Sequence, residues 1–359
     1  MEELFLLLAL VKARGIGPIL SRRLLEAFGS AKAVFEAKEQ ELRAVEGVTK
    51  AVIRSLKGQD PLLVGMKEWE RARDMGVELI SISDPRYPSN LREIYDPPLV
   101  LYVKGELKQQ DKNAVAVVGS RRCSPYGREF ARRLASCLAE AGVTVVSGLA
   151  RGIDTEAHLG ALEAGRTIAV LGSGMDRIYP PENYRLAQRI ASSGAVLSEF
   201  PLGTPPERWN FPVRNRVISG LSLGVVVVEA SAKSGALITA RLALEQGRTV
   251  FAVPGVVGSL FSQGTHRLIK EGAKLVEGPE DVLEEIMPQL EFPERGKPLQ
   301  GFSPDEEMVL ELLREGPKHV DELLRILKLE ASSLNPLLMG LELKGIVKQL
   351  PGRIYILCS

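Results

Sequence analysis

The sequence contains few of the residues that build disulfide frameworks and metal sites. Its 359 residues include three cysteines and three histidines. Cys123, Cys137 and Cys358 are widely spaced and odd in number, which excludes a disulfide framework and a Cys-x-x-Cys metal site. No two histidines lie at ligand spacing, so we expect no metal ion and no cofactor. This cysteine usage is typical of a reducing cytoplasm, where we expect the protein to reside.

The sequence also lacks a long hydrophobic run and an excess of charge of one sign. The longest apolar run near the start, Leu4 to Val11, is too short to span a bilayer and follows two glutamates instead of a basic segment. We therefore expect neither an export signal nor a membrane anchor. Lysine plus arginine total 46 and aspartate plus glutamate 45, for a net charge of +1. This balance excludes a surface that is basic throughout, and the 45% hydrophobic content argues against disorder.

Length and periodicity indicate several domains, since a domain commonly has ~150 residues. Residues 1–60 contain short helices separated by glycine turns, which indicates an all-helical domain. In residues 61–286, short β-branched runs alternate with helix-length segments, which predicts an α/β domain with a mostly parallel sheet. Residues 287–302 contain prolines and glycines and show no hydrophobic periodicity, which is typical of a linker. Residues 303–359 predict three helices and a terminal hairpin, the pattern of a winged helix.

Six strands are expected in the α/β domain, and each of them except the fourth is followed by a turn and a helix-length segment. In an open parallel sheet the carboxyl ends of the strands converge on one edge, so these turns should form one ligand crevice. The strands are expected at Ala114–Val118, Val143–Ser147, Thr167–Leu171, Ala195–Ser198, Val225–Glu229 and Thr249–Val253.

The turn after the first of these strands favours an anionic ligand. It reads Gly119-Ser120-Arg121-Arg122 and precedes a helix, so its backbone amides and the helix N-terminus would attract phosphate oxygens. A glycine needed only for chain geometry would explain Gly119 but not two adjacent arginines. The turn matches neither G-x-G-x-x-G nor a P-loop, which leaves ATP hydrolysis at a Walker site unsupported.

Two further turns offer similar chemistry. Ser173 and Gly174 follow the third strand, and Lys233 and Ser234 follow the fifth. Lys233 suits a phosphate, and Ser234 would cap the next helix. A lysine on a turn is usually only solvated, so its place at the same sheet edge as Arg121 is what favours a binding role.

The segment between the fourth and fifth strands, residues 205–216, combines three arginines with two aromatic rings. Cations that follow a phosphate backbone and rings that stack on bases are what a groove for single-stranded nucleic acid requires. We expect this segment to be too polar to be buried. The alternative is an ordinary surface loop with Trp209 and Phe211 packed into the core. Residues 119–248 contain 16 lysines and arginines and 11 acidic residues, so the basic surplus of 5 lies where the turns meet.

These segments resemble the DprA/Smf family, the bacterial DNA-processing proteins of natural transformation. The resemblance spans residues 119–272 through the motifs GSR..S.YG, SGLARGID, LGSGMDRIYPPEN, SEFPLGT.P....FPVRNRVISGLS, VVEA...SGALITA and VFAVPG. The first glycine turns resemble the family's helix-hairpin-helix-like (SAM-like) region, and the C-terminal part resembles its winged-helix domain. The resemblance implies an extended Rossmann-like fold between these two flanking domains.

The resemblance also implies a function. It implies a homodimer, formed through the Rossmann domain, that binds single-stranded DNA, protects incoming strands, and loads the RecA recombinase while displacing single-strand-binding protein. It implies no chemical reaction. Carried over motif by motif, the strand-binding residues are Arg121, Arg208, Phe211, Arg214, Asn215, Arg216 and Lys233, with supporting phosphate contacts from Ser120, Ser173 and Gly174.

One position departs from the family pattern. His266 stands where the family usually has asparagine. Either side chain can cap the following turn, so we expect His266 to pack locally and not to bind a metal.

A Rossmann-type enzyme that binds nucleotides or hydrolyses nucleoside monophosphates is the alternative function. Such enzymes also hold phosphate on glycine turns and use a glutamate, for which Glu199 and Glu229 at strand ends are candidates. Asp154 and Asp176 could also be catalytic, although a helix N-cap and a turn residue are the commoner roles. The P-G-G-x-G-T-x-x-E loop of those hydrolases is missing after Pro254, and no nucleophile–base pair is apparent. We therefore expect a protein that is not an enzyme.

A transcription regulator is the third possibility. Its winged helix would read duplex DNA with the helix expected over residues 332–344, in which only Lys344 is cationic. Helices that read duplex DNA usually present arginine, lysine, asparagine or glutamine. The composition of this helix favours a contact with protein.

Overall fold

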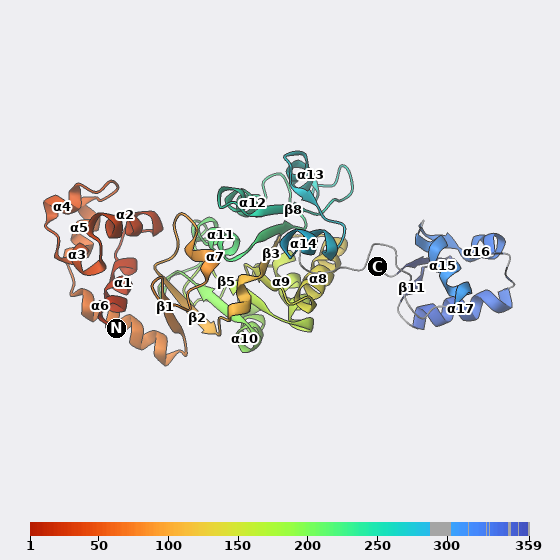
Figure 1. The fold of residues 1–359 in the computed structure, drawn as a ribbon, viewed down its shortest axis with the longest axis horizontal. Helices are drawn as coiled ribbons and strands as arrows, with labels where there is room; N and C mark the ends of the chain where they lie inside the picture. Colours follow the sequence, from red (N-terminus) through yellow and green to blue (C-terminus); the bar gives the residue numbers. More distant parts are fainter. Residues whose placement is uncertain are drawn as a thin grey trace. The chain divides into compact units, whose positions relative to one another are not determined.

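The computed structural model describes residues 1–287, 303–314, 316–327, 329, 331–343, 346–350 and 352–357. The chain divides into two compact units, Met1–Leu290 and Glu291–Ser359 (Figure 1). The predicted linker, apart from Met287, lies outside the described residues.

The first 74 residues form helices joined by short turns. Proline at the first helical position starts the second helix, and Gly29, with φ +81°, ends it in the left-handed conformation that glycine favours. Ser30 and Thr49 accept hydrogen bonds from the backbone as N-caps of two later helices. The helices are α1 (Glu2–Lys12), α2 (Pro18–Phe28), α3 (Ala31–Glu36), α4 (Glu39–Arg43), α5 (Lys50–Lys57) and α6 (Pro61–Asp74).

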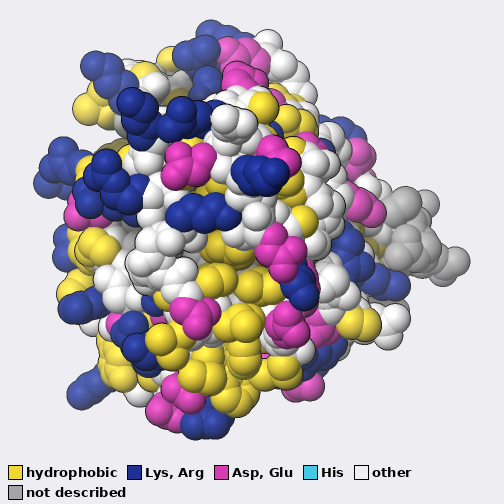
Figure 2. Space-filling view, turned by 90° about the vertical axis from the view of Figure 1, so that its left-hand side faces the viewer, with side chains coloured by type: hydrophobic (Ala, Val, Ile, Leu, Met, Phe, Trp, Pro, Cys, Tyr) yellow, Lys and Arg dark blue, Asp and Glu magenta, His cyan; other side chains and the backbone are white. Residues whose placement is uncertain are grey.

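The surface of this helical region is mixed. Figure 2 views the molecule from the side on which α1–α6 lie in Figure 1. Lysine and arginine side chains gather over the upper part of this face, and hydrophobic side chains gather over the lower part. No uniform basic coat covers this face, as the balanced composition predicts.

A buried carboxylate joins the helices to the sheet. Glu68 of α6 is fully buried, and its side chain accepts hydrogen bonds from the Tyr102 hydroxyl (2.9 Å) and the Leu202 amide (2.8 Å). The Lys12 ammonium forms an ion pair with the same carboxylate. Leu8 and Leu24 belong to the same hydrophobic cluster as Tyr102, so the core of the helices is continuous with one face of the sheet.

The central sheet has nine strands among the described residues, in the order β1-β2-β6-β5-β4-β3-β7-β8-β9. β1 and β2 are antiparallel to their neighbours, and the other pairs are parallel, which confirms the predicted α/β fold. The six predicted strands are confirmed within one residue at either end, except that β7 ends two residues early. The strands are β1 (Glu78–Ser81), β2 (Val100–Gly105), β3 (Ala114–Val118), β4 (Thr144–Ser147), β5 (Thr167–Val170), β6 (Ala195–Ser198), β7 (Gly224–Val227), β8 (Thr249–Ala252) and β9 (Lys274–Leu275).

The strand order places a topological switch point in the middle of the sheet. From β3 the chain moves through β4 and β5 to β6, and then returns to add β7, β8 and β9 on the other side of β3. The connections after β3 and β7 therefore diverge and leave a crevice at their carboxyl ends. The helices of this domain are α7 (Ser89–Arg92), α8 (Pro125–Glu140), α9 (Ile153–Ala164), α10 (Tyr184–Ser193), α11 (Asn210–Leu221), α12 (Ala236–Glu245), α13 (Gln263–Lys270) and α14 (Pro279–Ile286), with 3-10 turns η1 (Gln109–Lys112) and η2 (Pro181–Asn183).

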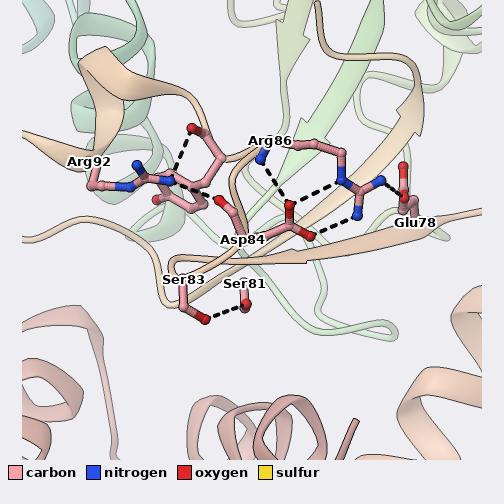
Figure 3. A network of polar contacts seen from close by, with 7 residues as sticks. Glu78, Ser81, Ser83, Asp84, Arg86 and Arg92 are labelled. Carbon is pink, nitrogen blue, oxygen red and sulfur yellow. Dashed lines mark hydrogen bonds and ion pairs between the residues drawn. The ribbon is translucent and has the colours of Figure 1, made fainter.

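An arginine holds the proline-rich connection between β1 and β2 (Figure 3). The Arg86 guanidinium donates hydrogen bonds to the Asp84 carboxylate from Nε (3.1 Å) and Nη2 (2.7 Å), and it forms an ion pair with Glu78. These hydrogen bonds hold the pKa of Asp84 below its usual value. Arg92 donates to the Asp84 carbonyl at 2.8 Å. The connection is thereby fixed, and Tyr87 within it is buried in the core.

The prediction that residues 205–216 are too polar to be buried is wrong. Residues 210–221 form α11, in which Asn210, Arg214, Asn215 and Arg216 are all buried. Trp209 is 69% exposed, so the alternative that packs it into the core is also wrong. The buried polar side chains are accommodated because carbonyl oxygens and carboxylates of neighbouring loops receive their hydrogen bonds and ion pairs.

The second unit has the predicted winged-helix elements. Three helices pack around a core that includes Val309, Leu323, Leu338 and Tyr355, and a three-stranded sheet has the order β10-β12-β11. Ser303 accepts a hydrogen bond from the Glu306 amide and caps the first helix, as predicted. Pro351 of the predicted hairpin turn and Lys344 lie outside the described residues. The elements are α15 (Pro304–Arg314), β10 (Lys318–His319), α16 (Val320–Leu327), α17 (Ala331–Leu343), β11 (Val347–Leu350) and β12 (Ile354–Leu357).

Among the described residues, no helix combines the length and the apolarity that crossing a bilayer requires.

Candidate functional site

A cavity of about 730 Å³ lies at the switch point, at the carboxyl ends of β3 and β7. This volume is within the range of ligand sites. One part of its wall is polar and comes from the turns after β3 and β7, and another part is apolar and comes from α11, α12 and the segment before α13. Of the predicted residues, Gly119, Ser120, Arg121, Arg122, Phe211, Arg214, Asn215 and Ser234 line it, together with Ser231, Ile218, Leu260 and Phe261.

The turn after β3 is fixed by Glu229 at the end of β7. The Ser120 amide donates to the Glu229 carbonyl at 2.7 Å, and the Glu229 carboxylate accepts hydrogen bonds from the amide and hydroxyl of Ser124. Ser124 in turn caps α8. The carboxylate of Glu229 is therefore committed to holding two loops together, which argues against the general-base role considered for it.

Two guanidinium groups flank one aromatic ring inside the cavity. The Arg121 Cζ atom lies 5.0 Å from the centroid of the Phe211 ring, and the Arg214 Cζ atom lies 5.9 Å from it. Both distances are within the range of a cation–π contact. Phe211 is only partly buried, so one part of the ring remains accessible.

Arg214 is a buried cation with incomplete charge compensation. Its guanidinium donates hydrogen bonds to the carbonyl oxygens of Gly148 and Val170. Burial lowers the pKa of Arg214 to about 10, the Asp154 carboxylate opposes this shift, and the positive charge of Arg121 adds to it. At neutral pH both arginines are charged, so an anion entering the cavity would relieve their repulsion.

Two glycines of the strand-end turns make room for these side chains. A Cβ atom on Gly172 would lie 2.8 Å from Cδ1 of Phe211, and a Cβ atom on Gly148 would lie 2.4 Å from Nη1 of Arg214. Carbon atoms do not approach so closely, so larger residues would displace the ring or the guanidinium. The turns after β4 and β5 thus help to position α11 side chains.

Asp154 lines the cavity but does not cap a helix. The helix α9 begins at Ile153 after Gly152, so the N-cap role considered for Asp154 is wrong. Its buried carboxylate accepts hydrogen bonds from the amides of Gly148 (3.2 Å) and Ala150 (3.3 Å) and so shapes the turn after β4. Burial raises the pKa of Asp154.

Ser234 and Lys233 occupy the turn after β7. The N-cap residue of α12 is Gly235, so the N-cap role predicted for Ser234 is wrong, although the Ser234 hydroxyl accepts a hydrogen bond from the Ala236 amide at 3.3 Å. Lys233 is exposed and does not line the cavity.

Four other predicted residues lie outside the cavity. Ser173 is buried and donates to the Arg177 carbonyl at 2.6 Å, and the Gly174 amide donates to the Thr204 carbonyl at 2.9 Å. Ser173 therefore holds its own turn, Gly174 joins this turn to the connection after β6, and neither residue lines the cavity. Arg208 is exposed, and it too is absent from the wall.

Arg216, the fourth, is buried in a separate ionic cluster. Its guanidinium forms ion pairs with Glu199 and, at 3.2 Å, with Asp96. Burial raises the pKa of Glu199 to about 7, and Arg216 opposes the shift. The structure therefore gives Arg216 carboxylate partners and no access to the cavity, and Glu199 is not a free base.

A small cavity of about 40 Å³ adjoins the Arg121–Phe211 pair and contains residues that the sequence analysis did not identify. Tyr179 and Arg151 line it, with Arg121, Phe211 and Arg214. The sequence signal was present, because both belong to the motifs that carry the family resemblance.

His266 packs locally, as predicted. Its Nε2 atom lies 2.9 Å from the carbonyl oxygen of Gly255. Within the described ranges, no three histidine, cysteine, aspartate or glutamate side chains gather as a metal site requires.

Cys123 and His158, which are candidates for nucleophilic and acid–base chemistry, do not line the cavity. Burial raises the pKa of the Cys123 thiol, which disfavours its thiolate. His158 is fully buried, and burial lowers its pKa to about 3. Besides the Asp154 carboxylate, the cavity wall presents guanidinium groups, hydroxyls and a ring, and these recognise phosphates and bases.

Comparisons with known proteins agree with this geometry. Residues 78–287 match the family model described as DNA recombination-mediator protein A, and residues 293–353 match the DprA winged helix domain. The chain is 35% identical to Protein Smf of Synechocystis, with 97% of both chains covered. It is 50% identical to the DNA processing protein DprA of Streptococcus pneumoniae over 57% of this chain and 73% of that protein.

Two solved structures share the fold. The X-ray structure of DNA processing protein A from Streptococcus pneumoniae is 39% identical, with a TM-score of 0.67 over 79% of this chain and 96% of that one. DNA processing protein A from Helicobacter pylori, solved in a study of its single-stranded DNA binding mode, is 31% identical, with a TM-score of 0.54 over 60% of this chain and 98% of that one. The chain therefore belongs to the DNA recombination-mediator protein A family, the DprA/Smf family.

Proposed function

We propose that the protein is a non-catalytic recombination mediator that binds single-stranded DNA in the cavity at the switch point. The observation that carries the proposal is the Arg121–Phe211–Arg214 arrangement, in which two cations flank one accessible ring. The single-stranded DNA binding named for the Helicobacter pylori relative supports it.

Phosphates would contact Arg121, Arg122 and the turns at Ser120 and Ser234, while a base stacks on Phe211. Such contacts read charge and ring faces and not base edges, so binding should be independent of sequence. Exposed Arg208 and Lys233 would attract the strand from the rim. Affinity should fall as the salt concentration rises, because the strand releases counterions on binding.

A titration of fluorescent oligothymidylate with Arg121→Ala and wild-type protein tests this function. We expect the variant to bind roughly 10- to 100-fold more weakly, since it loses a charge-assisted hydrogen bond and a stacked cation. Arg189→Ala is the matched control, because it removes the same charge from an exposed position on α10. Equal binding by Arg121→Ala and wild type at moderate salt would contradict the proposal.

We further propose that the bound protein acts in natural transformation in the cytoplasm, as a homodimer formed through the Rossmann domain. It would protect incoming strands, displace single-strand-binding protein and load RecA. The test measures RecA filament formation on strands coated beforehand with single-strand-binding protein. Failure to stimulate filament formation, with binding intact, would exclude loading, and sedimentation as a monomer at micromolar concentration would exclude the dimer.

A further inference from the structure

Tyr179 is an exposed aromatic residue beside the proposed DNA site. It lies in the connection between β5 and η2, and its side chain is 38% exposed. Its ring centroid is 5.9 Å from that of Phe211, with the two planes tilted by 44°. No hydrogen bond holds its hydroxyl among the described residues, so the exposed part of the ring and its hydroxyl are available to a ligand.

The spacing of the two rings suits successive bases of an extended strand. Bases stacked on one another along a strand are ~3.4 Å apart. The rings of Tyr179 and Phe211, 5.9 Å apart, contact each other directly, so no base fits between them and each ring would take a separate base of an extended strand. Sequence-independent binders of single strands use such consecutive aromatic rings.

Cations line the same small cavity as the two rings. Arg121, Arg151 and Arg214 all contribute to its wall. The partner of Arg151 is Glu182, and both side chains are about half exposed or more. An exposed ion pair of this kind contributes little to stability, so a phosphate can replace Glu182 at Arg151 without a large loss.

We propose that Tyr179 is a second base-stacking residue and that Arg151 binds the next phosphate, so that the strand passes from Phe211 over Tyr179 towards Arg151. This inference rests on the proposed function and extends its site by one nucleotide unit. The ligand is a single strand that carries bases. A sugar-phosphate chain without bases would contact only the arginines and not the aromatic rings.

Two probes separate stacking from charge. One is an oligothymidylate of about 15 nucleotides, long enough for a site of this type, and the other is an abasic strand of the same length. Tyr179→Ala and Tyr179→Leu should each weaken oligothymidylate binding about 5- to 100-fold and leave the abasic strand within about twofold of wild type. Tyr179→Phe should bind both strands like wild type, because it keeps the ring.

Arg151→Ala should weaken both strands alike and reduce the salt slope by about one. Tyr184→Ala, which removes a ring that is 53% exposed on α10, is the matched control and should change neither titration. Wild-type binding of oligothymidylate by Tyr179→Leu would overturn the inference, and so would an equal loss of both strands in Tyr179→Ala.

The Arg121→Ala titration distinguishes failure of this inference from failure of the proposed function. If Arg121→Ala loses binding and Tyr179→Ala does not, the site is correct and only the Tyr179 subsite is wrong. If Arg121→Ala binds like wild type, the proposed function fails, and the Tyr179 subsite fails with it.

Discussion

Arg214 and Arg216 are two residues apart on α11, yet their guanidinium groups lie in different surroundings. Arg214 reaches the switch-point cavity, where it meets carbonyl oxygens, the Phe211 ring and a second cation. Arg216 meets two carboxylates, those of Glu199 and Asp96. Two residues turn the helix by about 200°, which sends the two side chains to nearly opposite sides.

The different surroundings give the two arginines different roles, ligand binding for Arg214 and stabilisation of the fold for Arg216. Arg216 is neutralised inside the protein, so its charge is not available to a ligand. Arg214 donates to two carbonyl oxygens and to the Asn215 side chain, and the Asp154 carboxylate compensates its charge only in part. The same residue type can therefore fix the fold in one place and attract an anion in the other, and unfolding and binding experiments should distinguish the two.

Removing Arg216 should have the largest effect on stability. Arg216→Ala leaves the buried carboxylate of Glu199 and the partly buried one of Asp96 without their cation, and loss of one partner from a buried ion pair commonly costs about 3–5 kcal/mol. Denaturant titration would measure this loss in the free energy of unfolding. The protein that remains folded should still bind oligothymidylate, because Arg216 does not line the cavity. If Arg216→Ala lost no more stability than Arg189→Ala, the ion pairs of Arg216 would not stabilise the fold.

The pH dependence of unfolding should show a smaller effect from the same cluster. Burial raises the pKa of Glu199 from 4.5 to about 7, so between these values the folded state binds more protons than the unfolded state. The free energy of unfolding should therefore fall as pH rises through this window, by about 3 kcal/mol from this group. Glu199→Gln should flatten the fall, and Glu163→Gln, at an exposed ion pair, should not. An unchanged slope in Glu199→Gln would remove Glu199 as its source.

The smallest effect is expected from Gly148→Ala, a substitution that displaces the Arg214 side chain without removing it. In Gly148→Ala the added Cβ would lie 2.4 Å from Nη1 of Arg214, so the guanidinium must move away from its two carbonyl partners. We expect about 1–2 kcal/mol of lost stability and roughly tenfold weaker oligothymidylate binding. Gly340→Ala is the control, because a Cβ atom there meets nothing within 4 Å. Unchanged binding in Gly148→Ala would show that the position of Arg214 does not matter to the ligand.

The sheet could be predicted from the sequence because its strands are short apolar runs between turns. Parallel strands buried on both faces have this pattern, and the turns after them are at one edge in any open parallel sheet. That argument, together with the family motifs, correctly brought Arg121, Phe211, Arg214 and Ser234 together. It could not show that Ser173 bonds within its own turn and Gly174 to the connection after β6, since such loop hydrogen bonds leave no pattern in the sequence.

The helix α11 could not be predicted by the same means. An amphipathic helix is recognised by its polar stripe, whereas α11 is buried from Arg214 to Leu221 and has polar residues facing polar partners. Asn210, Arg214, Asn215 and Arg216 therefore look like surface residues in the sequence. The two arginines find their partners in Gly148, Val170, Glu199 and Asp96, which belong to other segments of the chain.

The buried carboxylate of Glu68 limits how freely the amino-terminal helices could be exchanged between relatives. Besides Tyr102 of β2, it binds the amide of Leu202, which lies in the connection that leads from β6 to α11. A chimera with another protein's helices would have to supply an equivalent acceptor at that point, or leave a buried hydroxyl and a buried amide unsatisfied. The amino-terminal helices therefore cannot be exchanged independently of the α/β domain. One of their side chains helps to set the path of the segment that carries Phe211 and Arg214.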